Sequence, residues 1–163
     1  MKMYQVDAFT TELFKGNPAA VIVSEDWLDV PLMQNIAAEN NLAETAFVKI
    51  IDDENYEIRW FTPKVEVDFC GHATLASSFV LFKDYTTAKT LQFHVKNLGI
   101  FTITQANDGK IQMNFPVRMP HKVEDYPELL NEVIDRPIQA VYMNQQAYIL
   151  VCASETDVIE AKP

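Results

Sequence analysis

The sequence predicts an α+β fold in which a mixed or antiparallel sheet wraps around one central buried helix. Two observations carry this prediction. The first 115 or so residues contain many segments with the apolar alternation of strands and only two segments with helical spacing. One of those helical segments, 71–82, is apolar nearly all round, which is typical of a helix inside a fold.

The expected elements follow the chain in order. Strands are predicted at 3–9, 19–23, 44–50 and 56–61, and a helix with Pro31 in its first turn comes between the second and third of them. A short alternating stretch at 65–69 leads through Gly71 into the buried helix. Three antiparallel strands follow at 90–95, 99–105 and 110–115, with turns at 96–97 and 107–109.

The segment 116–120 begins and ends with proline and reads as a linker, which suggests a domain at 1–118 and a second one at 119–163. In the second part we expect a helix over 126–134, strands at 138–143 and 147–151, and a helix beginning near Ser154 or Thr156. Because about 45 residues form a small core, the second domain is expected to be incomplete.

Composition narrows the class of function. The chain has 163 residues, 48% of them apolar, and a formal net charge of −10. This charge argues against binding to nucleic acid or to an anionic membrane surface. No apolar run is long enough to span a membrane, and the start of the chain lacks the apolar core of a signal peptide, so a cytoplasmic location is expected.

Several residues are candidates for chemistry. Glu44 precedes an apolar run, where partial desolvation would suit proton transfer, although a solvated loop glutamate is the alternative. His72 lies at the start of the buried helix, whose free N–H groups would bind an anion such as a carboxylate or phosphate. It is either a second proton carrier or hydrogen-bond donor, or a helix-cap histidine with no chemical role. Cys70 is either a thiol active in catalysis or a buried apolar residue. Asn17 is either a turn residue or part of a site.

Five segments in order resemble the N-terminal half of the phenazine-biosynthesis PhzF-like isomerases, which have the diaminopimelate epimerase-like fold. They are 4–10 (YQVDAFT), 16–21 (GNPAAV), 41–47 (NLAETAF), 59–63 (RWFTP) and 68–74 (DFCGHAT). The resemblance implies that Glu44 is the catalytic acid/base and that His72 contacts the substrate. It further implies that N–H groups of Gly71, His72 and Ala73 hold a carboxylate and that Asn17 lines the cleft.

Three hypotheses follow. The first is a cofactor-independent isomerase or epimerase that moves a proton on a small carboxylate substrate, with no metal and as a homodimer. The second is a truncated, non-catalytic homologue that self-associates or binds only an anion, because family members carry a second half of the site that 119–163 does not match. The third is a two-thiol epimerase using Cys70. The other cysteine, Cys152, lies in an apolar segment and is interpreted as a core residue, so the second thiol is not evident. The sequence leaves enzyme activity and substrate open.

Overall fold

The computed structural model describes residues 1–162 and contains two compact units, Met1–Phe115 and Pro116–Pro163. The elements of the first unit are β1 (Met3–Ala8), β2 (Asn17–Ser24), α1 (Val30–Asn40), β3 (Glu44–Ile50), β4 (Asn55–Phe61), β5 (Glu66–Val67), α2 (Gly71–Asp84), β6 (Thr90–Val95), β7 (Gly99–Gln105) and β8 (Ile111–Met113).

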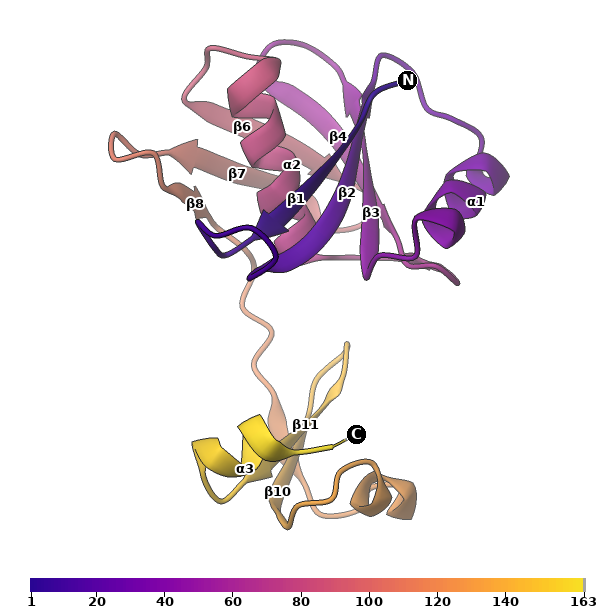
Figure 1. The fold of residues 1–163 in the computed structure, drawn as a ribbon, viewed down its shortest axis with the longest axis vertical. Helices are drawn as coiled ribbons and strands as arrows, with labels where there is room; N and C mark the ends of the chain where they lie inside the picture. Colours follow the sequence, from indigo (N-terminus) through magenta and orange to yellow (C-terminus); the bar gives the residue numbers. More distant parts are fainter. Residues whose placement is uncertain (163) are drawn as a thin grey trace. The chain divides into compact units, whose positions relative to one another are not determined.

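The strands of this unit form one eight-stranded sheet in the order β1-β2-β3-β4-β6-β7-β8, with β5 paired to β4. The pairs β2·β3 and β4·β6 are parallel and the other pairs are antiparallel. Figure 1 shows the sheet curling around α2, with α1 on its outer side. The predicted α+β fold with a mixed sheet around a central helix is therefore confirmed.

Helix α2 is buried because its sequence lets strands approach closely. Seven of its residues are buried, and four of these are Ala73, Ala76, Ser77 and Ser78, which have small side chains. A buried hydroxyl needs a partner, and the helix supplies it: the hydroxyls of Ser77 and Ser78 donate to the carbonyl oxygens four residues earlier, at 2.7 and 2.8 Å. The helix can thus be surrounded by apolar strands without an unsatisfied hydroxyl.

Alternation along β2 and β3 explains why both faces of the sheet are covered. Val21, Ala46 and Val48 lie in the core that packs on α2, while Ile22 and Phe47 belong to a second cluster with residues of α1. Since successive side chains of a strand point to opposite faces, these continuous apolar runs are buried on both sides.

The second unit contains β9 (His121–Val123), a 3₁₀ helix (Glu128–Glu132), β10 (Ile138–Met143), β11 (Tyr148–Cys152) and α3 (Glu155–Glu160). Its strands pair antiparallel in the order β11-β10-β9. The helix predicted over 126–134 is wrong in type and length, because only the short 3₁₀ helix forms, and none of its residues is buried. Among the described residues of this unit, Val141 alone has a buried apolar side chain.

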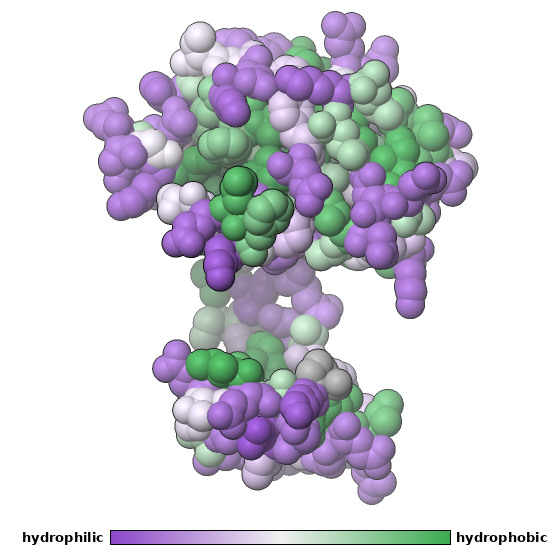
Figure 2. All heavy atoms as spheres, in the orientation of Figure 1, coloured by the Kyte–Doolittle hydropathy of each residue, from purple (hydrophilic) through white to green (hydrophobic). Residues whose placement is uncertain are grey.

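The loop between β1 and β2 exposes large apolar side chains. Phe9, Leu13 and Phe14 are 70%, 79% and 91% exposed, and Phe9 and Phe14 have positive φ angles of 65° and 66°. Figure 2 shows apolar side chains reaching the surface of the first unit among hydrophilic ones.

None of the helices within residues 1–162 combines the length and hydropathy needed to cross a bilayer.

Candidate active site

Glu44 is the first residue of β3, and strand alternation fixes the direction of its side chain. It shares a face with Ala46 and Val48, both of which are fully buried in the core against α2. The parallel register pairs Glu44 with Ala19 of β2, another residue of that core. The carboxylate therefore lies on the α2 side of the sheet, at the end where β3 begins.

The start of α2 provides the other groups. Cys70 is its N-cap residue, with an extended backbone (φ −143°, ψ 114°), and Gly71 and His72 are its first two helical residues. The first N–H to bond within the helix is that of Thr74, which donates to the carbonyl oxygen of Cys70 at 3.1 Å. The N–H groups of Gly71, His72 and Ala73 precede this bond and mark the positive end of the helix dipole.

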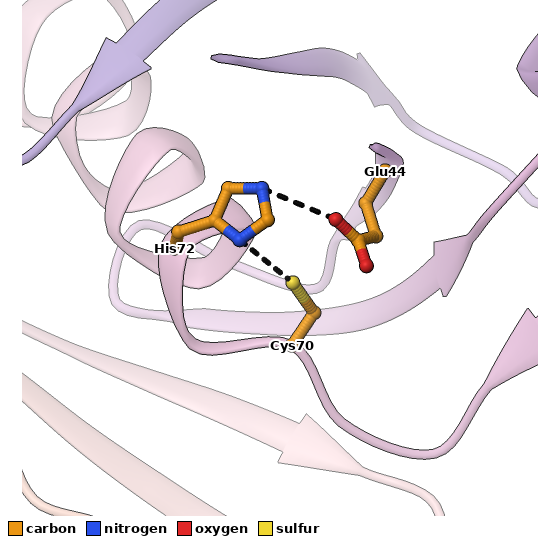
Figure 3. Close-up of side chains that lie close together, drawn as sticks. All are labelled: Glu44, Cys70 and His72. Carbon is orange, nitrogen blue, oxygen red and sulfur yellow. Dashed lines mark hydrogen bonds and ion pairs between the residues drawn. The ribbon is translucent and has the colours of Figure 1, made fainter. Parts of the chain in front are cut away.

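Glu44, His72 and Cys70 meet at this point (Figure 3). The Nε2 atom of His72 lies 3.2 Å from the Oε2 atom of Glu44, and its Nδ1 atom lies 3.3 Å from the Cys70 Sγ atom. The His72 and Glu44 side chains are 11% and 19% exposed, so Glu44 is not a solvated loop residue. Within residues 1–162, Glu44 Oε2 and His72 Nε2 are buried and make no hydrogen bond of good geometry.

The thiol of Cys70 is held in its neutral form. Burial raises its pKa from 9.0 to about 12, and the nearby carboxylate of Glu44 adds to the rise, while the N–H groups of Ala73 and His72 offset part of it. A thiol that keeps its proton near neutral pH is a poor nucleophile and a poor base. The two-thiol hypothesis is accordingly disfavoured, and Cys70 is the only cysteine in the first unit.

The hydroxyls of Thr74 and Thr45, which neighbour the site in the sequence, are engaged in other hydrogen bonds. The hydroxyl of Thr74 donates to the carbonyl oxygen of Cys70 at 2.6 Å, which ties the N-cap to the first turn. The hydroxyl of Thr45 is buried and accepts a hydrogen bond from Asn40 Nδ2 at 3.2 Å. Both hydroxyls thus already have partners within the first unit.

Asn17 lies at the same end of the sheet but outside the contacts of the cluster. It is exposed, begins β2, and stands two residues before Ala19, the strand partner of Glu44. His94 lies on β6, and its Nε2 atom is 3.0 Å from Asn55 Oδ1 on β4. His121 belongs to the second unit.

A groove of about 630 Å³ lies away from this cluster, on the other face of β4, and is lined in part by Trp27, Glu57, Arg59 and His94. Two of its charged groups are already paired: Glu57 with Lys49 at 3.0 Å, and Arg59 with Glu66 at 2.7 Å, while Lys96 also lines the groove.

The contact between Cys70 and His72 was not predicted from the sequence. Both residues were considered singly, Cys70 as a thiol before a helix and His72 as a residue at its mouth. The available signal was their spacing of two across Gly71 at a helix start, which brings the side chains of the N-cap and the second helical residue together.

A curled mixed sheet around a buried helix, with a carboxylate facing the N-terminus of that helix, defines an α+β protein of the epimerase-like type. The sequence model of the phenazine biosynthesis-like proteins, PhzC-PhzF, matches residues 6–163, and the chain belongs to this family. The resemblance noted from the five segments is thereby confirmed.

Two bacterial relatives illustrate the match. An uncharacterized isomerase of Halalkalibacterium halodurans is 43% identical over 166 residues, covering 99% of this chain and 60% of its own length. An uncharacterized isomerase of Pseudomonas aeruginosa is 38% identical over 163 residues, covering 100% of this chain and 61% of its own length. The chain therefore spans about three fifths of the length of these relatives.

Solved structures agree with the fold. A PhzF-family protein of Enterococcus faecalis superposes with a TM-score of 0.82 at 41% identity, over 99% of this chain and 60% of that one. A predicted epimerase of Pseudomonas aeruginosa superposes with a TM-score of 0.76 at 18% identity, over 98% of this chain and 62% of that one. The second likeness concerns the fold alone.

Proposed function

We propose that this chain carries the proton-transfer groups of a cofactor-independent isomerase or epimerase acting on a small carboxylate. Glu44 is the acid/base that removes and returns a proton at carbon. The observation that carries this proposal is the position of its carboxylate, 3.2 Å from His72 Nε2 and beside the N-terminus of α2. The name isomerase, printed for the relatives, agrees with this reaction class.

The chemistry needs a positive environment next to a base. Removing a proton from the carbon next to a carboxylate moves negative charge onto the carboxylate oxygens in the transition state. N–H groups at a helix N-terminus are already oriented toward such an anion and need no reorganisation when the charge develops. In the proposal, the N–H groups of Gly71, His72 and Ala73 bind the substrate carboxylate, and Asn17 lines the approach.

His72 serves to orient the base. Its Nε2 atom faces the carboxylate of Glu44, and its Nδ1 atom faces the Cys70 thiol, so the ring is held from both sides. The 3.2 Å contact between Nε2 and the carboxylate keeps Glu44 beside the helix N-terminus. The substrate itself stays unassigned within the class of small carboxylates.

Binding can be tested before turnover. In a ¹⁵N-labelled chain titrated with acetate, we expect the amide signals of Gly71, His72 and Ala73 to shift in a saturable way. Those of Gly99, at the start of β7, and Gly109, in the turn before β8, should stay unchanged. Uniform small shifts over the surface would contradict a carboxylate site at the helix start.

Proton transfer is tested by exchange in D₂O. A panel of small α-substituted carboxylic acids is incubated with the chain, and loss of the Cα–H signal is followed by ¹H NMR. Glu44→Gln keeps the size of the side chain and should lower the exchange rate by about 10²–10⁴-fold. Glu39→Gln, at an exposed position of α1, is the matched control and should exchange at the wild-type rate. Exchange retained in Glu44→Gln would remove Glu44 from this role.

The homodimer and the cytoplasmic location suggested by the sequence stay predictions. Analytical ultracentrifugation of the chain tests the first, with a mass of about one chain as the contrary result.

A further inference from the structure

The Glu44–Cys70–His72 cluster has a ligand chemistry that proton transfer does not use. It offers one carboxylate oxygen, one thiol sulfur and one imidazole nitrogen, and these atoms lie within 4.8 Å of one another. Around a tetrahedral zinc ion, bonds of about 2.0–2.3 Å place the ligand atoms about 3.5 Å apart. The Cys70 Sγ and His72 Nδ1 atoms, at 3.3 Å, are already at such a separation.

We infer that Glu44, Cys70 and His72 form a binding site for a thiophilic divalent cation such as Zn²⁺, which blocks the carboxylate of Glu44 when it is bound. In this site one ring nitrogen of His72 binds the ion, because Cys70 lies on the Nδ1 side of the ring and Glu44 on the Nε2 side. The fourth position stays open to water, as in zinc sites with three protein ligands.

Burial and unmet bonding support the inference. The three side chains are largely buried, Cys70 being 7% exposed. Within residues 1–162, Glu44 Oε2 lacks a hydrogen bond although it is buried, and a buried carboxylate without such a bond is costly. A cation bonded to the carboxylate supplies the missing partner.

The charges of the three ligand groups and the fixed positions of their residues also support the inference. A thiolate and a carboxylate together neutralise a divalent ion beside a neutral imidazole. Cys70 and His72 are fixed two residues apart at a helix start, and Glu44 is fixed at the start of a strand. Sulfur and imidazole ligands select zinc and similar ions over Mg²⁺ or Ca²⁺, which prefer oxygen.

The thiol must lose its proton when the ion binds. The S–H bond breaks, the sulfur–metal bond forms, and one proton passes to the buffer for each ion bound. The N–H groups of Ala73 and His72 that already offset the burial of the Cys70 sulfur would stabilise the resulting thiolate. Affinity is therefore expected to fall as pH is lowered.

Binding of the ion is independent of the proposed isomerase activity, whereas inhibition by the ion rests on it. A metal held by Glu44 occupies the proposed base, so proton exchange should stop in proportion to occupancy. A chain that binds the ion but exchanges no protons would refute the activity and leave the site standing.

The experiment uses the tag-free chain and Co²⁺ as a visible probe. Titration at neutral pH should produce a thiolate-to-cobalt absorption band that saturates at about one ion per chain, and Zn²⁺ should abolish it by displacement. Mg²⁺ should have no effect. Absence of the band in the wild-type chain would overturn the inference.

Variants locate the site. Cys70→Ser should eliminate the band, His72→Ala should weaken binding at least tenfold, and Cys152→Ser, which removes the other cysteine, should leave the titration unchanged. Loss of the band in Cys152→Ser, with retention in Cys70→Ser, would place the ion elsewhere and refute the proposal.

A measurement on the wild-type chain guards against a variant that does not fold. Zn²⁺ should slow alkylation of Cys70 by iodoacetamide at least tenfold, as quantified by peptide mass spectrometry, and should leave the rate at Cys152 unchanged. Equal rates at Cys70 with and without Zn²⁺ would overturn the inference even if Cys70→Ser were unfolded.

Discussion

The Oε2 atom of Glu44 lies 3.2 Å from the Nε2 atom of His72, although the two residues come from different elements, β3 and α2. This contact couples a strand end to a helix start. It makes the direction of the carboxylate dependent on the imidazole, and the two side chains should act as one unit in proton exchange.

A double-mutant cycle tests whether Glu44 and His72 act together. His72→Ala should lower the exchange rate by about 10²-fold, because a displaced base loses that much for a shift near 1 Å. Glu44→Gln should cost more, and the double variant should be no slower than Glu44→Gln alone, since residues that act together are not additive. The rates come from the Cα–H exchange assay, and multiplicative losses would show that His72 acts independently of Glu44.

Acid should weaken the turn between β3 and β4 through Asp52. Its Oδ1 atom accepts hydrogen bonds from Asn55 Nδ2 and from the backbone N–H groups of Glu54 and Asn55, at 2.8, 3.0 and 2.8 Å. These bonds, led by that from the Asn55 side chain, hold the pKa of Asp52 below 3.8. Because the folded state favours the ionised form, its contribution to stability is present above pH 3.8 and is lost as pH falls through the folded pKa.

Thermal unfolding followed by circular dichroism between about pH 6 and pH 2 measures this effect. Asp52→Asn keeps an acceptor oxygen but cannot titrate, so its melting temperature should fall less steeply on acidification than that of the wild type. Asp26→Asn, at another exposed position of the first unit, controls for the loss of one negative charge. Parallel curves for wild type and Asp52→Asn would exclude the turn from the acid response.

Local patterns in the sequence predicted most of the first unit because its elements obey simple periodicities. The buried helix, the antiparallel run β6-β7-β8 and the strand of Glu44 follow from apolar spacing and turn residues. The parallel pairings β2·β3 and β4·β6 do not, because the register between strands separated by other elements depends on tertiary packing rather than on local pattern.

Part of the site could also be predicted from the periodicity of the sequence. Glu44, Ala46 and Val48 alternate, so a buried helix packed on the last two had to face the first. The packing of β3 on that particular helix could not be read from the chain. In the second unit, the pattern of Leu129, Leu130 and Val133 suggested a helix, but none of the 3₁₀ helix residues is buried, and an unburied helix of that length is marginal in water.

Substitution of Phe47 tests how much the apolar cluster between the sheet and α1 contributes to stability. Its ring is 2% exposed and packs edge-on against Phe61, with the centroids 5.4 Å apart. Phe47→Ala leaves a cavity and should lower the free energy of unfolding by about 3–5 kcal/mol. Phe14→Ala is the matched control, because Phe14 is 91% exposed and its loss should change stability by no more than about 0.5 kcal/mol. Equal effects in chemical denaturation would contradict the assigned burial.

Gly16 and Gly71 give opposite expectations for the same substitution. A Cβ atom on Gly16 would lie 2.7 Å from Thr10 Cγ2 and closer still to the carbonyl oxygen of Ala8, so the loop before β2 has no space for it. Gly16→Ala should therefore destabilise the first unit by about 1–3 kcal/mol.

A Cβ atom on Gly71 meets only Phe69 Cζ, at 3.9 Å. Since Gly71 is helical, Gly71→Ala should raise stability by about 0.4–1 kcal/mol through the unfolded state. Chemical denaturation of Gly16→Ala and Gly71→Ala under the same conditions measures both changes in stability. If Gly71→Ala is the more damaging of the two, the first turn of α2 is more crowded than its backbone implies, and the N–H groups proposed to bind a carboxylate are not open to a ligand.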